Sequence, residues 1–144
     1  MDVFLANEQS LGFDEVTLSA LARHTLTQEE VDEGAELSLL FVEADHIRKL
    51  NQRFAGDDYA TDVLAFPMME DEEDGSLLLG DVVICPQVAE KNAGELGHDL
   101  QDELAALVVH GTLHLLGYDH QRDADKEKMD NRSREILSTF SAPR

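Results

Sequence analysis

The sequence predicts an α+β protein with one mixed sheet of about four strands, helices packed on that sheet, and a metal site at the end of a long helix. Three observations lead to this fold class. Strand-like and helix-like segments follow one another without strict alternation. Segments 62–66 and 77–85 are consecutive strands joined by an acidic loop, which favours antiparallel pairing. The longest helical pattern, 100–116, runs directly into a cluster of histidines.

The first half of the chain is expected to hold two strands and two helices. Residues 3–6 form a short apolar run, and residues 37–42 form a nearly continuous one that is typical of a buried strand. Between them, Asp14 can cap a helix whose apolar residues recur at helical spacing. Residues 44–53 place their apolar side chains on one face of a second helix.

The next pair of strands is marked by proline and glycine. Strand 62–66 is expected to end at Pro67, and Gly80 within strand 77–85 indicates a bulge or a close approach of another backbone. Pro86 suits the first turn of a helix that continues to about residue 96, since proline is favoured at that position.

Two further helices complete the prediction. Asp99 is expected to cap helix 100–116, and the last helix covers 124–137, followed by a frayed tail at 138–144. The residues expected to face inward from the last helix are Met129, Ser133, Ile136 and Leu137.

The length and the net charge of the chain limit which classes of function are possible. The chain has 144 residues, the length of one domain, so we expect residues 1–144 to form a single domain. With 31 acidic and 11 basic residues, the net charge of −20 repels polyanions and disfavours a broad basic nucleic-acid platform. A DNA partner is therefore not expected, although a small, locally positive site remains compatible with this charge.

The compartment is also predicted from composition. The single cysteine excludes an intrachain disulfide, and the N-terminus lacks the pattern of a secretory signal. No apolar run approaches the length of about 20 residues that a membrane span needs. We therefore expect a cytoplasmic protein without a membrane partner.

Three histidines carry the strongest chemical signal. His110 and His114 are four residues apart on the predicted helix, so they lie one turn apart on the same face. Gly117 can end that helix, and the turn that follows can return His120 toward the same point. Three histidine nitrogens with a fourth position left for water or substrate are typical of catalytic zinc sites. A divalent ion held there would attract anions and lower the pKa of its bound water toward neutrality.

The alternative of a metallopeptidase is weakened by one position. In the zinc-peptidase pattern H-E-x-x-H, the glutamate after the first histidine is the general base. Gly111 occupies that position here, so peptide hydrolysis by that mechanism is only a distant alternative.

Residues 110–120, HGTLHLLGYDH, resemble the signature of the YbeY family of bacterial metal-dependent endoribonucleases. The resemblance extends over most of the chain. Further matching segments are Leu50-Asn51, 61–67 (TDVLAFP), 80–84 (GDVVI), 103–109, Met129 and 135–137.

This resemblance implies a zinc ion on His110, His114 and His120, although three histidines also accept other divalent transition metals. It implies cleavage of single-stranded RNA, with ribosomal RNA and the small ribosomal subunit as partners. It further implies roles in maturation of the 3′ end of 16S ribosomal RNA and in ribosome quality control. The oligomeric state is not indicated.

One family feature is missing. Many family members carry an arginine after an aromatic residue in the segment before T-D-V-L, and that position falls on Ala55, after Phe54. Arg53 is the candidate substrate-binding residue nearby, but on a helix it would point in a different direction. Together with the net charge, this absence favours an alternative in which the protein is a ribosome-associated factor whose zinc is chiefly structural.

Two further sets of residues each have two possible roles. Asp62 could take a turn role or could hydrogen-bond a ligand histidine. The basic residues between 122 and 134 alternate with acids, so they form either a solvated helix face or a strip that contacts RNA. These basic residues are Arg122, Lys126, Lys128, Arg132 and Arg134.

Overall fold

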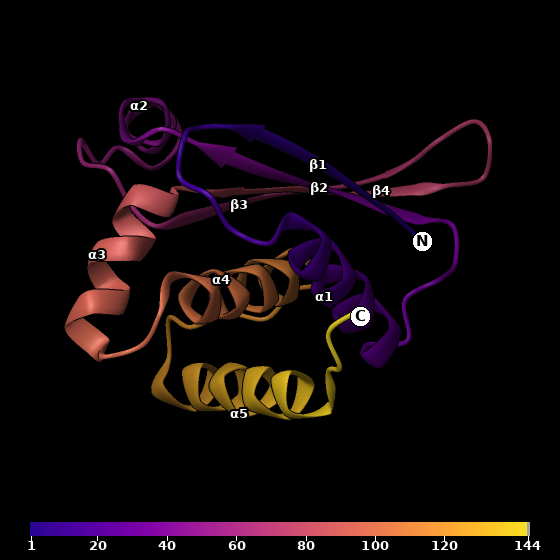
Figure 1. Ribbon diagram of the computed structural model, residues 1–144. Coiled ribbons are helices and arrows are strands. Elements are labelled where there is room, and N and C mark those ends of the chain that lie inside the picture. Colours follow the sequence, from indigo (N-terminus) through magenta and orange to yellow (C-terminus); the bar gives the residue numbers. More distant parts are fainter. Residues whose placement is uncertain (144) are drawn as a thin grey trace.

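The computed structural model describes residues 1–143 and confirms the predicted α+β class (Figure 1). It contains one four-stranded sheet and five helices. The strands are β1 (Asp2–Glu8), β2 (Ala35–Val42), β3 (Val63–Asp71) and β4 (Leu77–Ile84). The helices are α1 (Glu15–Gln28), α2 (Ala44–Ala55), α3 (Pro86–Leu96), α4 (Leu100–Leu115) and α5 (Asp123–Thr139).

The sheet is mixed and has the order β1-β2-β4-β3. β1 pairs with β2, and β2 with β4, in parallel, whereas β3 and β4 are antiparallel as the sequence predicts. The apolar β2 lies inside the sheet because both of its edges are paired and helices cover both faces. β3 is left as an edge strand.

Helices cover the two faces of the sheet unequally. α1 and α4 lie on one face, and α5 packs under α4, while α2 lies on the other face (Figure 1). The larger core forms between the sheet and α1, α4 and α5, and it includes Leu18, Phe41, Val82 and Leu113. A smaller core forms beneath α2 around Ile47 and Val83. Because α4 lies between the sheet and α5, most of its surface is buried.

The helix starts follow from capping chemistry. The Asp14 carboxylate accepts from the Thr17 backbone N–H at the start of α1, at 3.1 Å. The Asp99 carboxylate accepts from the Asp102 backbone N–H at the start of α4, at 2.8 Å. Each carboxylate satisfies a backbone donor that has no partner within the helix.

Several predicted elements are too short: β1, β2 and α2 each extend up to two residues beyond the predicted range, and β3 extends farther. β3 continues through Pro67 to Asp71 instead of ending at the proline. An edge strand tolerates proline, and here Pro67 lies opposite Gly80 where the pairing register shifts. Gly80 has φ of +142°, and a Cβ there would lie 2.2 Å from the Phe66 carbonyl oxygen, which confirms the predicted close approach.

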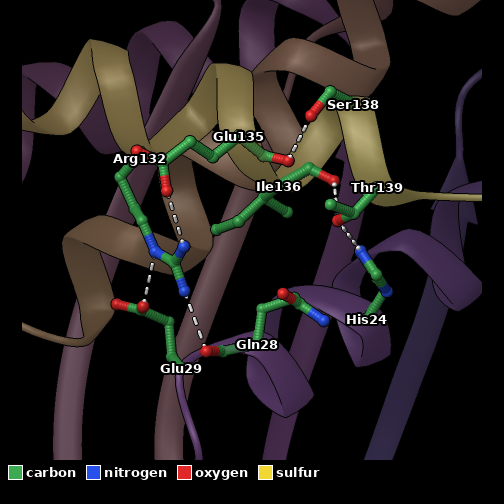
Figure 2. A network of polar contacts seen from close by, with 8 residues as sticks. All are labelled: His24, Gln28, Glu29, Arg132, Glu135, Ile136, Ser138 and Thr139. Carbon is green, nitrogen blue, oxygen red and sulfur yellow. Dashed lines mark hydrogen bonds and ion pairs between the residues drawn. The ribbon is translucent and has the colours of Figure 1, made fainter.

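The C-terminal helix is also longer than expected, because it reaches Thr139. Ser138 and Thr139, expected in a frayed tail, donate from their hydroxyls to helix carbonyls. His24 of α1 then bonds the Thr139 hydroxyl at 2.8 Å (Figure 2). Arg144, the last residue of the predicted tail, lies outside the described residues.

Arg132 joins α5 to the end of α1. Its guanidinium donates to the Glu29 carboxylate at 2.9 Å and to the Gln28 carbonyl oxygen at 2.8 Å (Figure 2). That carbonyl belongs to the last turn of α1, where helix carbonyls lack partners and the helix dipole favours a cation. The contact fixes α5, and with it the loop that carries His120, against the rest of the fold.

Within residues 1–143, no helix is both long enough and apolar enough to cross a membrane.

Candidate metal centre

The α4 helix places two of the three histidines at its C-terminal end. His110 and His114 lie one turn apart, and both face a pocket between α4 and β3. Gly117 follows the helix with φ of +102°, a conformation that glycine adopts without strain. Its N–H donates to the His114 carbonyl, and the Tyr118 N–H donates to the Leu113 carbonyl. This pair of bonds is a Schellman motif, which ends the helix as the sequence predicts and turns the chain back.

The turn brings the third histidine to the first two. The ring centre of His120 lies 5.7 Å from that of His110 and 5.9 Å from that of His114. Asp119 stabilises this loop, since its carboxylate accepts from the Gln121 backbone N–H at 2.9 Å. The three predicted ligands therefore converge on one place in the fold.

The histidines line a pocket of about 520 Å³. One wall is the start of β3 and the residues before it, and the other is the exposed face of α4. Apart from the histidines, none of the described residues that line it is basic. Its lining consists of Thr61, Asp62, Val63, Leu64, Ala65, Glu103, Ala106, Leu107, His110, Gly111, His114 and His120.

Burial favours the neutral form of His110. Desolvation lowers the pKa of this imidazole, and the neighbouring His120 lowers it further, while Asp130 of α5 acts in the opposite direction. A neutral imidazole has a free nitrogen lone pair, which is the form that binds a metal ion.

The residues fit a metal ion in a second respect. His114 Nδ1 is buried and has no hydrogen-bond partner in the described part of the chain. Buried polar atoms are nearly always paired, so an unpaired ring nitrogen beside two other imidazoles is consistent with a ligand site.

The ring of His120 lies farther from the other two histidine rings than it would around a bound ion. Among residues 1–143, no group of three or more His, Cys, Asp or Glu side chains is already close enough to hold an ion. In a tetrahedral zinc site, ring centres lie about 5.2 Å apart, because each lies about 3.2 Å from the ion. The ring centre of His120 lies 5.7 and 5.9 Å from those of His110 and His114, which is farther than this.

The structure explains why Gly111 cannot be replaced by the peptidase glutamate. A Cβ at this position would lie 2.6 Å from Val82 Cγ1 and 3.5 Å from Val63 Cγ2. Residue 111 therefore faces the sheet, where α4 packs directly on β4 and β3. A carboxylate in this position would meet the core rather than a substrate.

Two carboxylates reach the pocket from elsewhere. Glu103 is buried two turns before His110 on α4, and its carboxylate pairs with the His98 imidazole at 2.7 Å. Sequence reasoning missed Glu103, because the seven-residue spacing to His110 was the only signal for a shared helix face. Asp62 lines the opposite wall, where it accepts from Asn92 Nδ2 at 3.3 Å.

The candidate substrate-binding arginine lies outside this pocket. Arg53 is exposed near the end of α2, and its guanidinium carbon lies 5.2 Å from the centre of the Phe54 ring. Ala55, the position of the family arginine, is the exposed last residue of α2.

Three of the five basic residues between 122 and 134 have hydrogen-bond partners on the protein itself. Lys126 pairs with Asp130 at 2.9 Å, and Arg132 pairs with Glu29. Arg134 donates to the Asn131 side chain at 2.7 Å. These contacts support the interpretation of a solvated helix face rather than a strip that contacts RNA.

Comparison with known proteins identifies the family and the fold. A family model described as "Endoribonuclease YbeY" matches residues 4–141. The chain is 44% identical to Endoribonuclease YbeY of Parafrankia sp. (strain EAN1pec), over 97% of this chain and 94% of that protein. It is 43% identical to Endoribonuclease YbeY of Pelotomaculum thermopropionicum, over the full length of both. The solution structure of TM1509 from Thermotoga maritima is similar with a TM-score of 0.64 and 31% identity, over 94% of this chain and 87% of that one.

Proposed function

Because this chain belongs to the YbeY family of endoribonucleases, we propose that it is a zinc-dependent enzyme that cleaves single-stranded RNA. The observation that carries this proposal is the convergence of His110, His114 and His120 on one open pocket. Structural zinc sites are usually closed by four protein ligands, whereas catalytic sites keep one position for water or substrate. Three histidines beside an open pocket correspond to the catalytic arrangement.

The role of the ion follows from the charges around it. A zinc ion held by His110, His114 and His120 would keep its full charge, because imidazole ligands are neutral, and it would supply Lewis acidity to the pocket. The pocket has no arginine or lysine among its described lining residues, so the phosphodiester has no other cation there. Zinc can be replaced by another divalent transition metal on the same ligands.

The protein's own residues then orient the substrate. Asp62 and Glu103 are carboxylates on opposite walls, and each is held by a neighbour, Asn92 and His98 respectively. Carboxylates accept hydrogen bonds from ribose hydroxyls and from base amino groups. They also repel phosphates, so we expect them to direct the phosphodiester toward the histidines.

In the cell, the proposed substrate is ribosomal RNA. Following the family resemblance, we propose that the enzyme matures the 3′ end of 16S ribosomal RNA and acts in ribosome quality control. Its partners would be ribosomal RNA and the small ribosomal subunit, and it would act in the cytoplasm.

A second candidate is a ribosome-associated factor with a chiefly structural zinc. The observation that favours it is the combination of Ala55 at the arginine position with a pocket whose non-histidine charges are acidic. A structural zinc would be essential for folding but would give no cleavage.

Cleavage of a labelled single-stranded RNA by the zinc-loaded protein separates the two candidates. We expect cleavage by the wild type and by His46→Ala, a control that removes an exposed histidine on α2. We expect none from His114→Ala. A zinc-loaded, folded wild type that leaves the RNA intact would favour the structural role.

A further inference from the structure

Three aromatic side chains stand at the end of α2, in the loop that follows it and on the edge strand β3. Phe54 and Tyr59 have 60% and 57% of their surface exposed, an unusual degree for rings of this size. The ring of Phe66, on β3, lies 5.2 Å from the Phe54 ring in an edge-on arrangement. We refer to Phe54, Tyr59 and Phe66 as the aromatic patch.

The patch is held in place by its surroundings. Phe66 packs into the smaller core beneath α2, so it supports Phe54 from below. The buried Asn51 side chain donates to the Tyr59 carbonyl oxygen at 3.0 Å, which fixes the loop that carries Tyr59 to α2. The exposed rings are therefore presented by a fixed backbone, and they lose little freedom when something stacks on them.

A cation accompanies the rings. The Arg53 guanidinium lies 5.2 Å from the centre of Phe54, and none of the ion pairs found within residues 1–143 involves Arg53. α2 carries three basic residues and only one acidic residue, in a protein of net charge −20. Exposed aromatic rings with an arginine beside them are the combination on which bases of single-stranded nucleic acids stack.

The patch is continuous along the chain with the histidine pocket. Tyr59 stands two residues before Thr61, and Phe66 directly follows Ala65, while Thr61 and Ala65 both line that pocket. Val63 and Ala65 pack toward α4, whereas Phe66 packs toward α2, so the pocket and the patch lie on opposite faces of β3. Since β3 is an edge strand, a flexible polymer can pass around it from one face to the other (Figure 1).

We infer that the aromatic patch binds bases of single-stranded RNA on the face of β3 opposite to the histidine pocket. This inference rests on the proposed function of the histidine pocket and adds a second subsite to it. Stacking suits this protein, because its net charge repels phosphates and stacking needs no positive surface. The patch would favour unpaired RNA, since bases within a duplex do not expose their faces.

The chain offers a direct spectroscopic test. It has no tryptophan and only two tyrosines, so Tyr118→Phe leaves Tyr59 as its only tyrosine. We expect a hydrolysis-resistant, phosphorothioate-linked single-stranded RNA to quench Tyr59 emission in the zinc-loaded variant. An abasic strand of the same length should not. Equal quenching by both strands, or by neither, would overturn the inference.

A second test measures the binding of labelled RNA by fluorescence anisotropy. Phe54→Leu keeps an apolar side chain without a stacking face, and we expect it to weaken binding about tenfold. The matched control is Phe4→Leu, which removes another exposed ring, with 53% of its surface accessible, from the opposite edge strand β1. This control should bind RNA as tightly as the wild type.

The outcomes separate the patch from the proposed function. If the wild type cleaves RNA and Phe54→Leu binds RNA as tightly as the wild type, the patch does not bind RNA. The endoribonuclease proposal then still stands. If RNA quenches Tyr59 and Phe54→Leu binds more weakly, but no cleavage occurs, the patch is supported and the cleavage proposal fails. Quenching by a purified ribosomal protein but not by RNA would also overturn the inference.

Discussion

At the scale of single residues, Gly111 separates this histidine pattern from that of a zinc peptidase. The absence of a side chain lets α4 lie close to the sheet, since a Cβ would come within 2.6 Å of Val82. The residue that supplies a base in peptidases is thus used here for packing. The histidines on either side gain a fixed position from that close contact.

This packing role predicts the effect of Gly111→Ala. The added methyl group overpacks the contact with a β-branched side chain, so we expect the free energy of unfolding to fall by about 1–3 kcal/mol. Urea denaturation measures this change. Gly94→Ala in α3 is the control, because a Cβ there meets nothing within 4 Å. It should stabilise the protein by about 0.5–1 kcal/mol, and equal effects of the two variants would contradict the account.

Ala55 leads to a prediction about substrate affinity. An arginine at this exposed position would restore the cation that the family resemblance leads us to expect there, and it could contact a phosphate. One charge-assisted hydrogen bond contributes about 1.5 kcal/mol, so Ala55→Arg should tighten RNA binding about tenfold. Metal content should stay unchanged. Ala55→Gln, similar in reach but uncharged, should bind RNA like the wild type, and an equal gain by both variants would exclude a charge effect.

At the scale of elements, the sequence was sufficient to predict every helix and strand, because each has a strong local signal. Asp14 and Asp99 mark helix starts, and Gly117 marks the end of α4. The errors occur where tertiary contacts override local signals. β3 passes through Pro67 because it is an edge strand, and α5 continues past Leu137 because His24 binds Thr139.

Other features had no local signal at all. The order β1-β2-β4-β3 depends on how the strands pack between helices, and the individual segments do not encode it. The three histidines could be predicted because they are close in sequence. Glu103 had only its seven-residue spacing to His110 as a signal, and Asp62 reaches the same pocket because β3 packs on α4.

The junction of α5 with α1 leads to a prediction at this scale. Arg132 binds both the Glu29 carboxylate and the last turn of α1 (Figure 2). Arg132→Ala leaves both acceptors without their donor, so we expect the free energy of unfolding to fall by about 1–3 kcal/mol. Arg134→Ala, which removes a contact within α5 only, should change it by less than about 0.5 kcal/mol. Thermal or urea unfolding compares the two, and an equal loss would show that the junction contributes nothing.

At the scale of the whole molecule, charge sets how RNA can be bound. A net charge of −20 disfavours an extended basic surface, and Lys126 and Arg132 of α5 are paired with acidic neighbours. Under the proposed function, the affinity for RNA would come from the metal centre and from contacts that do not depend on phosphate neutralisation. This arrangement differs from that of most nucleic-acid-binding proteins, whose affinity depends on released counterions.

We therefore predict that the affinity for RNA depends only weakly on salt concentration. Binding to single strands normally has a log–log slope of about −0.7 for each phosphate neutralised, so many contacts give a steep loss of affinity. We expect a slope smaller in magnitude than about 1 between 50 and 200 mM salt. Anisotropy titrations at several salt concentrations measure it. A slope of several units would reveal an extended basic surface that the fold does not show.

The central claim is that one metal ion on three histidines enables RNA cleavage. Zinc titration into the chelator-stripped protein, with RNA cleavage as the readout, tests it most directly. The account predicts that cleavage rises with added zinc and saturates at one equivalent per chain, and that His114→Ala stays inactive at every ratio. Full cleavage by the stripped wild type, or equal cleavage by His114→Ala, would contradict it.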